Sequence, residues 1–448
     1  MATATGTVYL VHAIDTEGPL YESLDATFDR LYEIFGIRLE PTRSNLLAIQ
    51  NGTLDFGDKT DLVREALSSH RTTTLGTWDQ IEQMLDRVTS DKFRNVERDS
   101  FGRGWVYSWF CLDHVGFENN PRRRDMGYHN VYDFYDRYLK QLKSCPDEIQ
   151  WHFHPVSTYK DAHRCATHYF RSNEIFEILT RKIIDRNFFP SSFRAGFQVE
   201  RPDSHWFLEQ YIPFDISNMS TESTFDLDNS IDFKNGRSGD WRGAPFDWSV
   251  YHPSHDDYRR RGDCRRLIGR ALNLRNRIGN LTQNEMNLAF ERAANGVDSL
   301  VGMCSHDWRD LGPEVDEARE FLRNSSYKYP DVDFKFCTAT EAFRKFVVKS
   351  GERPLELNID FNEGTREDVP NVTITAKSGR VFGPQPFVAI KTKGGRYLHD
   401  NLDFDTRAGK WHYAFHADTL PLEDVREFAV AANDFLGNTS IARRCFDP

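Results

Sequence analysis

Two pairs of side chains that can ligate a metal or move a proton each have one residue between their members. Asp15 and Glu17 follow the apolar run 8–14, and His152 and His154 end a second short run. Residues two apart in an extended chain point to the same face, so each pair should act together. Imidazoles that meet carboxylates from a neighbouring strand end would form an N/O metal site with open positions. Alone, D-x-E can stabilise a turn and H-x-H can arise by chance, but both together favour the metal site.

An arginine and a histidine beside two further short runs could complete acid–base chemistry. Arg194 lies at a strand-to-loop junction, where it could ion-pair a catalytic carboxylate or form a purely structural salt bridge. His306 ends another apolar run and is a candidate general acid, because imidazole titrates near neutrality. Asp307 follows directly and could hold that imidazole in its productive tautomer.

The aromatic stretch 246–254 is interpreted as a loop on the substrate side. It contains Asp247, Trp248 and His252, and Trp308 is assigned to the same surface. Asp247 is also an alternative carboxylate partner for the general acid.

Short apolar runs alternate with helical patterns through the first three quarters of the chain, which predicts a parallel sheet closed into a barrel. Ile175, Ile178, Leu179 and Ile183 share one helix face, and 338–341 has the capping-box pattern. The pattern fits an eight-stranded barrel and an irregular seven-stranded one equally well. In either, side chains at the carboxyl ends of the strands form the active site. The expected strands are 8–14, 105–112, 149–153, 212–217, 300–304 and 334–337, with long inserts at 20–70 and 218–260.

The sequence pattern changes near residue 351, from apolar runs alternating with helical patterns to short period-two runs. This change predicts a barrel domain over 1–350 and a second domain over 351–448. Period-two runs at 355–360, 372–375, 387–391 and 411–415 predict a small antiparallel β-sandwich. Trp411, Tyr413 and Phe415 alternate, so they should share one face. Core packing explains that face better than a sugar-binding platform does.

Bulk properties narrow the class of protein. The chain has 448 residues and a formal net charge of −11, which argues against general nucleic-acid binding. Seven scattered cysteines without a C-x-x-C fit reduced thiols, and no stretch has the length of a leader or a membrane span. We therefore expect a cytoplasmic protein. The arginine clusters 122–124, 259–261 and 265–266 could be solvated or could clamp a diphosphate.

The order of these motifs resembles the five motifs of the polysaccharide deacetylase (NodB-homology) superfamily, and more closely its branch in bacterial surface-polysaccharide gene clusters. The resemblance spans roughly residues 8–346. It implies a distorted (β/α)7 barrel and a divalent metal, commonly zinc, that serves to hydrolyse N-acetyl groups on sugars. The matching segments are Asp-Thr-Glu-Gly-Pro at 15–19, Glu-Ile-Gln-Trp-His-Phe-His-Pro at 148–155, Phe-Arg-Ala-Gly at 193–196, Asp-Trp at 247–248 and Ser-His-Asp-Trp at 305–308.

Roles carried over by the resemblance make Asp15 the catalytic base and Glu17 a metal ligand. His152 and His154 match the metal histidines, Arg194 matches the arginine that tethers the base, and His306 matches the general acid.

Two features depart from the usual motifs. Glu17 replaces an aspartate, and the histidine pair is spaced by two residues rather than four. His163 or His168 could therefore replace His152 or His154 as a ligand.

The expected activity is metal-dependent removal of an N-acetyl group from a sugar nucleotide or a lipid-linked precursor, with Zn²⁺ as the expected ion. Nucleic acid is not an expected partner, and a homo-oligomer is possible. Two alternatives remain at this point: hydrolysis of an O-acetyl or formyl group, and an inactive barrel that binds carbohydrate or serves as a scaffold.

Overall fold

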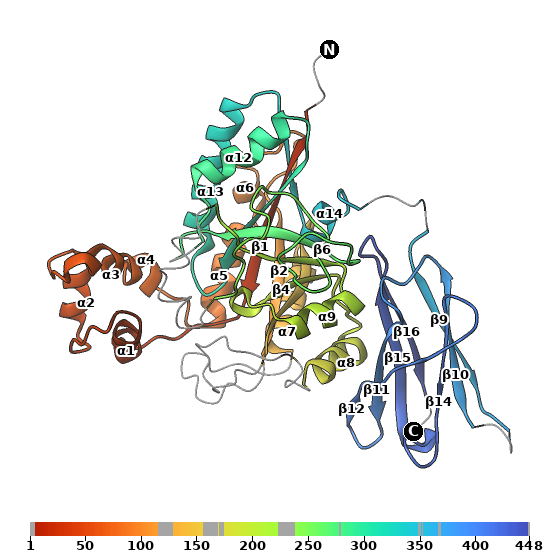
Figure 1. The fold of residues 1–448 in the computed structure, drawn as a ribbon. Coiled ribbons are helices and arrows are strands. Elements are labelled where there is room, and N and C mark those ends of the chain that lie inside the picture. Colours follow the sequence, from red (N-terminus) through yellow and green to blue (C-terminus); the bar gives the residue numbers. More distant parts are fainter. Residues whose placement is uncertain are drawn as a thin grey trace.

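A closed barrel of seven parallel strands forms the centre of the molecule (Figure 1). The computed structural model describes residues 5–114, 129–155, 169, 174–222, 238–276, 279–347, 351, 353–365 and 369–446. The strands follow one another around the barrel in chain order, which confirms the predicted distorted (β/α)7 architecture. They are β1 (Thr7–Thr16), β2 (Tyr107–His114), β3 (Glu148–His154), β4 (Ser192–Ala195), β5 (Phe214–Asn218), β6 (Leu267–Asn273) and β7 (Ser299–His306).

Strand β1 closes the barrel in an uneven way. One of its edges pairs with β7 over residues 8–15. The other edge is shared, because residues 7–11 pair with an eighth strand, β8 (Asp333–Cys337), and residues 12–16 pair with β2. The barrel is therefore closed directly only along the carboxyl-terminal half of β1, the end at which Asp15 lies.

Amphipathic helices cover the outside of the barrel. The helix predicted from Ile175, Ile178, Leu179 and Ile183 is α8, and all four side chains are buried. The predicted capping box opens α14, where Thr338 and Glu341 cap each other. The helices around the barrel are α5 (Trp78–Val88), α6 (Asp91–Arg94), α7 (Asn130–Gln141), α8 (Glu174–Arg186), α9 (Pro202–Tyr211), α12 (Gln283–Ala294), α13 (Leu311–Lys328) and α14 (Ala339–Phe343).

The two long inserts have different structures. The first forms four α-helices and one short 3-10 helix, η1 (Gly57–Lys59). The α-helices project to one side of the barrel in Figure 1 and bury Phe28, Leu31, Ile49 and Val63 in a small core of their own. They are α1 (Leu24–Phe35), α2 (Arg43–Gln50), α3 (Thr60–Ala66) and α4 (Ser69–Thr72). The second insert contains no helix in its described parts, residues 218–222 and 238–260.

The carboxyl-terminal part is an antiparallel β-sandwich, as predicted. One sheet has the order β13-β14-β10-β9 and the other β12-β11-β15-β16. Trp411, Tyr413 and Phe415 are buried in the core between the sheets, which confirms their structural role. The strands are β9 (Glu356–Asn362), β10 (Asn371–Ser378), β11 (Phe387–Thr392), β12 (Tyr397–Leu398), β13 (Asp403–Phe404), β14 (Lys410–Ala414), β15 (Val425–Asn433) and β16 (Thr439–Cys445).

The sandwich packs against the barrel beside α8 and α9 (Figure 1). Phe387 of β11 lies in one apolar cluster with residues of both helices. Asn433 donates hydrogen bonds to the carbonyls of Pro190 and Tyr211, at 2.8 and 3.0 Å. Among the described helices, none is long and apolar enough to cross a membrane.

Candidate active site and metal centre

Asp15 and Arg194 form a buried ion pair inside the carboxyl-terminal end of the barrel. Arg194 donates from Nε to Oδ1 of Asp15 at 2.6 Å and from Nη2 to Oδ2 at 3.1 Å. Both side chains are 1% exposed. Burial alone would raise the pKa of Asp15, but the charges of Arg194, His152 and His306 together hold it below its usual value. Asp15 is therefore an ionised carboxylate at neutral pH.

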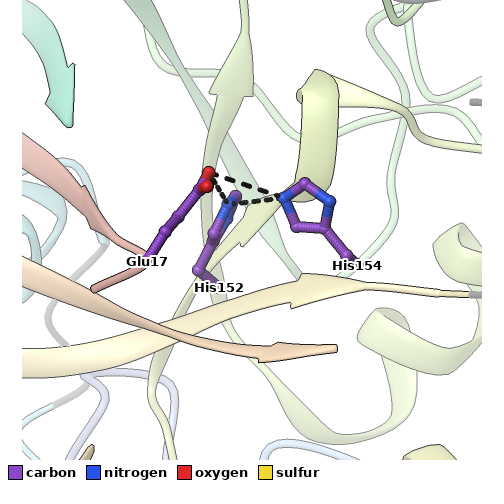
Figure 2. A group of neighbouring side chains, drawn as sticks. All are labelled: Glu17, His152 and His154. Atoms are coloured by element: carbon purple, nitrogen blue, oxygen red, sulfur yellow. Dashed lines mark hydrogen bonds and ion pairs between the residues drawn. The ribbon is translucent and has the colours of Figure 1, made fainter. Parts of the chain in front are cut away.

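Glu17, His152 and His154 bring three ligand atoms to one point beside that ion pair (Figure 2). The Nε2 atoms of the two histidines are 3.0 Å apart, and Oε1 of Glu17 lies 3.7 and 3.8 Å from them. Ligands bound tetrahedrally to one ion at about 2.0–2.1 Å would lie about 3.4 Å from one another. The three atoms thus fit a common divalent ion after small adjustments.

The histidine pair is oriented by strand β3 and by its neighbours. Nδ1 of His152 donates to the carbonyl of Arg194 at 3.0 Å, which leaves Nε2 free of a proton and able to bind a metal. The ring of His154 packs against Phe197 with centroids 4.8 Å apart. Burial lowers the pKa of His152, but Asp15 and Glu17 outweigh that effect and raise it, as expected where two carboxylates face an imidazole.

His306 ends β7 and faces the same carboxylates. Its Nε2 lies 3.9 Å from Oδ2 of Asp15 and 3.9 Å from Oε1 of Glu17. Burial lowers its pKa to about 4, although Glu17 and Asp15 act to raise it. Its Nδ1 is buried and has no hydrogen-bond partner in the described parts of the chain, so neither Asp307 nor Asp247 fixes its tautomer there.

Asp307 lies next to His306 but supports the metal-binding loop. Its Oδ1 accepts from the backbone N–H of Glu17 at 2.8 Å, and its Oδ2 accepts from that of Gly18 at 3.0 Å. The hydroxyl of Tyr135 also donates to Oδ2 at 2.9 Å. Asp307 is fully buried, and its observed contacts position the backbone of Glu17 and Gly18, whereas the sequence led us to expect that it would orient the imidazole of His306.

Trp308 is the one predicted substrate-side residue that lies beside the site. Its ring centroid is 5.2 Å from that of His306, and Arg309 stacks over it.

Asp247, Trp248 and His252 are not brought to the site, which corrects their interpretation as substrate-side residues. The segment that carries them runs antiparallel to the start of β6, as the bridge between Tyr251 and Ile268 shows. Trp248 is buried, and its carbonyl accepts from the backbone of Leu300 near the start of β7. All three therefore lie toward the amino-terminal end of the strands, opposite the metal ligands.

The arginine clusters are largely neutralised. Arg259 pairs with Asp240 and Asp257, and Arg265 pairs with Glu209. The other pairs are Arg260–Asp257, Arg261–Asp247, Arg266–Glu200 and Arg266–Asp215. The cluster 122–124 and the alternative ligands His163 and His168 lie outside the described residues.

Two supporting features were not foreseen from the sequence. Cys304 lies beside the ion pair, where its Sγ accepts from Nη2 of Arg194 at 2.9 Å. Gly196 leaves room for the imidazole ring of His154, because a Cβ at position 196 would lie 2.4 Å from Cδ2 of that ring. The sequence contained a signal for the second feature, since a glycine directly follows Phe-Arg-Ala at the end of a strand.

No family model and no curated protein matches this chain. Among solved structures it is similar to the "putative polysaccharide deacetylase from Mycobacterium smegmatis", with 11% sequence identity and a TM-score of 0.34. The match covers 76% of this chain and 93% of that chain. A similarity at this level does not by itself assign a function.

Proposed function

We propose that this chain is a metal-dependent hydrolase that removes an N-acetyl group from a sugar. The observation that carries the proposal is the meeting of Glu17, His152 and His154 within 4.8 Å of one another, beside the buried, ionised Asp15. A purely structural salt bridge would not need two imidazoles and a second carboxylate facing it.

The donor set suits a divalent transition ion such as zinc, which binds imidazole nitrogen and carboxylate oxygen and keeps a position open in catalytic sites. An ion held there would polarise an acyl oxygen and lower the pKa of a bound water.

The side chains divide the proton transfers between them. Asp15 accepts a proton from the attacking water, and Arg194 holds the carboxylate in place and ionised. His306 is neutral at rest, so it must take up a proton before it can donate one. Its Nε2 lies 3.9 Å from Oδ2 of Asp15, so one intervening water or a small approach of the ring would carry that proton to His306, which then passes it to the departing amine.

The substrate class follows from the motif resemblance. The proposed substrate is a sugar nucleotide or lipid-linked precursor of a bacterial surface polysaccharide, and zinc is the proposed ion. The pairing of Arg259, Arg265 and Arg266 with carboxylates removes these arginines as candidates for a diphosphate clamp.

The test is elemental analysis of the purified chain together with acetate release from N-acetylated sugars. We expect about one equivalent of metal, lost in His152→Ala and in His154→Ala, and retained in Asp15→Asn, which should not turn over. Retention of metal in either histidine variant would move the ligand search to His163 and His168.

The same measurements separate the alternative functions. Acetate or formate released only from esters or formyl amides would indicate a different acyl substrate. Absence of metal after reconstitution, with sugar binding intact, would favour an inactive barrel that binds carbohydrate.

A further inference from the structure

Trp206 stands out among the tryptophans of this protein. The chain has nine, and all of them lie in the described residues. Trp206 is 47% exposed, whereas the other eight are buried or half-buried. It projects from the first turns of α9, whose neighbouring residues His205 and Phe207 are buried. An indole left in solvent on a rigid helix is a ready stacking surface.

A pocket of about 410 Å³ lies against this indole. One wall is the start of α9, and the opposite wall is the irregular segment before β6. Arg201 and Trp206 line the first wall, and Asp240, His255 and Asp256 line the second. Its volume and mixed lining are typical of small-molecule sites.

The floor of the pocket is held rigidly by buried charges. Arg266 is fully buried and donates to Glu200 at 2.7 Å and to Nδ1 of His205 at 2.8 Å. Nε2 of His205 in turn donates to the carbonyl of Ser254 at 3.0 Å, which ties α9 to the opposite wall. These contacts preorganise the pocket without occupying the exposed groups above it.

A short stretch of chain, residues 197–201, links the metal centre to the pocket. Phe197 touches the ring of His154, and the chain then reaches Arg201 in the pocket wall within about 14 Å at most. Phe197 and Gln198 both have left-handed backbones, with φ of 51° and 54°. Such strain outside glycine is concentrated at functional sites. Gly239 on the opposite wall donates to the carbonyl of Phe197 at 3.0 Å, so both walls meet at this turn.

The charges of the lining select the kind of ligand. Most charges of the lining are already paired, Arg259 with Asp240 and Asp257, and Glu200 with the buried Arg266. The lining side chains therefore carry no excess of positive charge that would hold a phosphate. Neutral hydroxyl groups both donate and accept hydrogen bonds, so they can use carboxylates and guanidinium groups alike.

We infer that this pocket is a second sugar subsite, which binds a neutral sugar residue stacked on Trp206 while another residue of the same glycan lies at the metal centre. The inference rests on the proposed function and extends it, since the substrate then contains several linked sugars.

The test compares N-acetylglucosamine with its β-1,4-linked tetramer. Binding to the metal-loaded full chain is measured by calorimetry, and oxidation of Trp206 by N-bromosuccinimide is mapped by mass spectrometry. We expect the tetramer to bind about tenfold more tightly than the monomer and to protect Trp206 from oxidation. Trp206→Ala should abolish the tenfold gain and leave monomer binding and metal content unchanged, whereas Trp206→Phe should keep most of it. Tyr327→Ala, at a residue that is 90% exposed on α13, is the matched surface control and should behave as the wild type.

Equal binding of both sugars by the wild type, no protection of Trp206, or an unchanged gain in Trp206→Ala would each overturn the subsite. The proposed function fails separately, by absence of metal and of acetate release, because neither measurement involves Trp206.

Discussion

Arg194 of β4 reaches across the barrel interior to Asp15 of β1 and binds both of its carboxylate oxygens, although these strands are not neighbours in the sheet. The pair joins opposite walls of the barrel at the level of the metal ligands. Because the pair is buried, removing Arg194 would leave the charged carboxylate of Asp15 without a partner and without water, which costs free energy.

Arg194→Met should therefore lower the free energy of unfolding by about 3–5 kcal/mol, measured by urea denaturation. Adding Asp15→Asn to this variant should restore part of the loss, because the unpaired charge is then removed. The exposed pair Arg87–Asp310 is the control, and Arg87→Met should cost less than about 1 kcal/mol. Equal losses in both single variants would contradict a special role for the buried pair.

Asp307→Asn should weaken metal binding about 10- to 100-fold while the protein stays folded, because an amide cannot accept from both backbone N–H groups that hold Glu17 in place. Tyr135→Phe removes only the phenol that braces this carboxylate, so its effect should be smaller. Competition with a chelating dye measures the affinity, and wild-type affinity in Asp307→Asn would exclude the positioning role.

Gly196→Ala should displace the ring of His154 and lose the metal. The added Cβ would lie 2.8 Å from the Nε2 ligand atom and 2.4 Å from Cδ2. Gly76→Ala is the matched control, because the nearest atoms to its added Cβ are 3.9 Å away. Elemental analysis and circular dichroism of both variants would show whether metal is lost without unfolding, and full metal content in Gly196→Ala would mean that His154 is not a ligand.

His399 should make the protein less stable in mild acid. Its ring stacks on Phe176 of α8 and packs at a tilt against Phe387 of β11, with centroids 4.7 and 4.1 Å apart, and Nδ1 donates to the carbonyl of Val388. Burial lowers its pKa from 6.5 to about 4. The unfolded chain therefore takes up a proton first, and the free energy of unfolding falls as the pH drops from about 6.5 toward 4.

At pH 5 this loss is about 2 kcal/mol at most, and less to the extent that solvent reaches the half-buried ring. His399→Phe keeps an aromatic ring at the interface but cannot titrate. Urea denaturation at pH 7.5 and pH 5.0 should show a smaller loss for this variant than for the wild type. Parallel losses would assign the acid sensitivity to other groups.

Strand predictions succeeded where a short apolar run ended in a turn and failed where the run was mixed. β6 contains Gly269 and Arg270, so its sequence does not predict a buried strand. Arg270 is nevertheless fully buried, and its charge is paired with Glu285. β15 contains the alanine-rich end of 425–433, which has no strong strand preference.

The position of Asp307 directly after His306 also predicted that the two side chains would face different sides. Consecutive residues at a strand end point to opposite sides, so a residue next to His306 should not share its face. The contacts of Asp307 with Glu17, Gly18 and Tyr135 agree with that alternation.

The sequence by itself determined which residue types stand at the strand ends and that the strands form a barrel followed by a sandwich, because apolar runs and period-two alternation are local properties of the chain. The tertiary structure alone decided which side chains meet. Asp15 and Arg194 are 179 positions apart in the sequence, and only the closure of the barrel brings them to 2.6 Å. It also decided that Asp247 lies at the far end, because the direction in which an irregular segment runs along a strand depends on packing between distant residues.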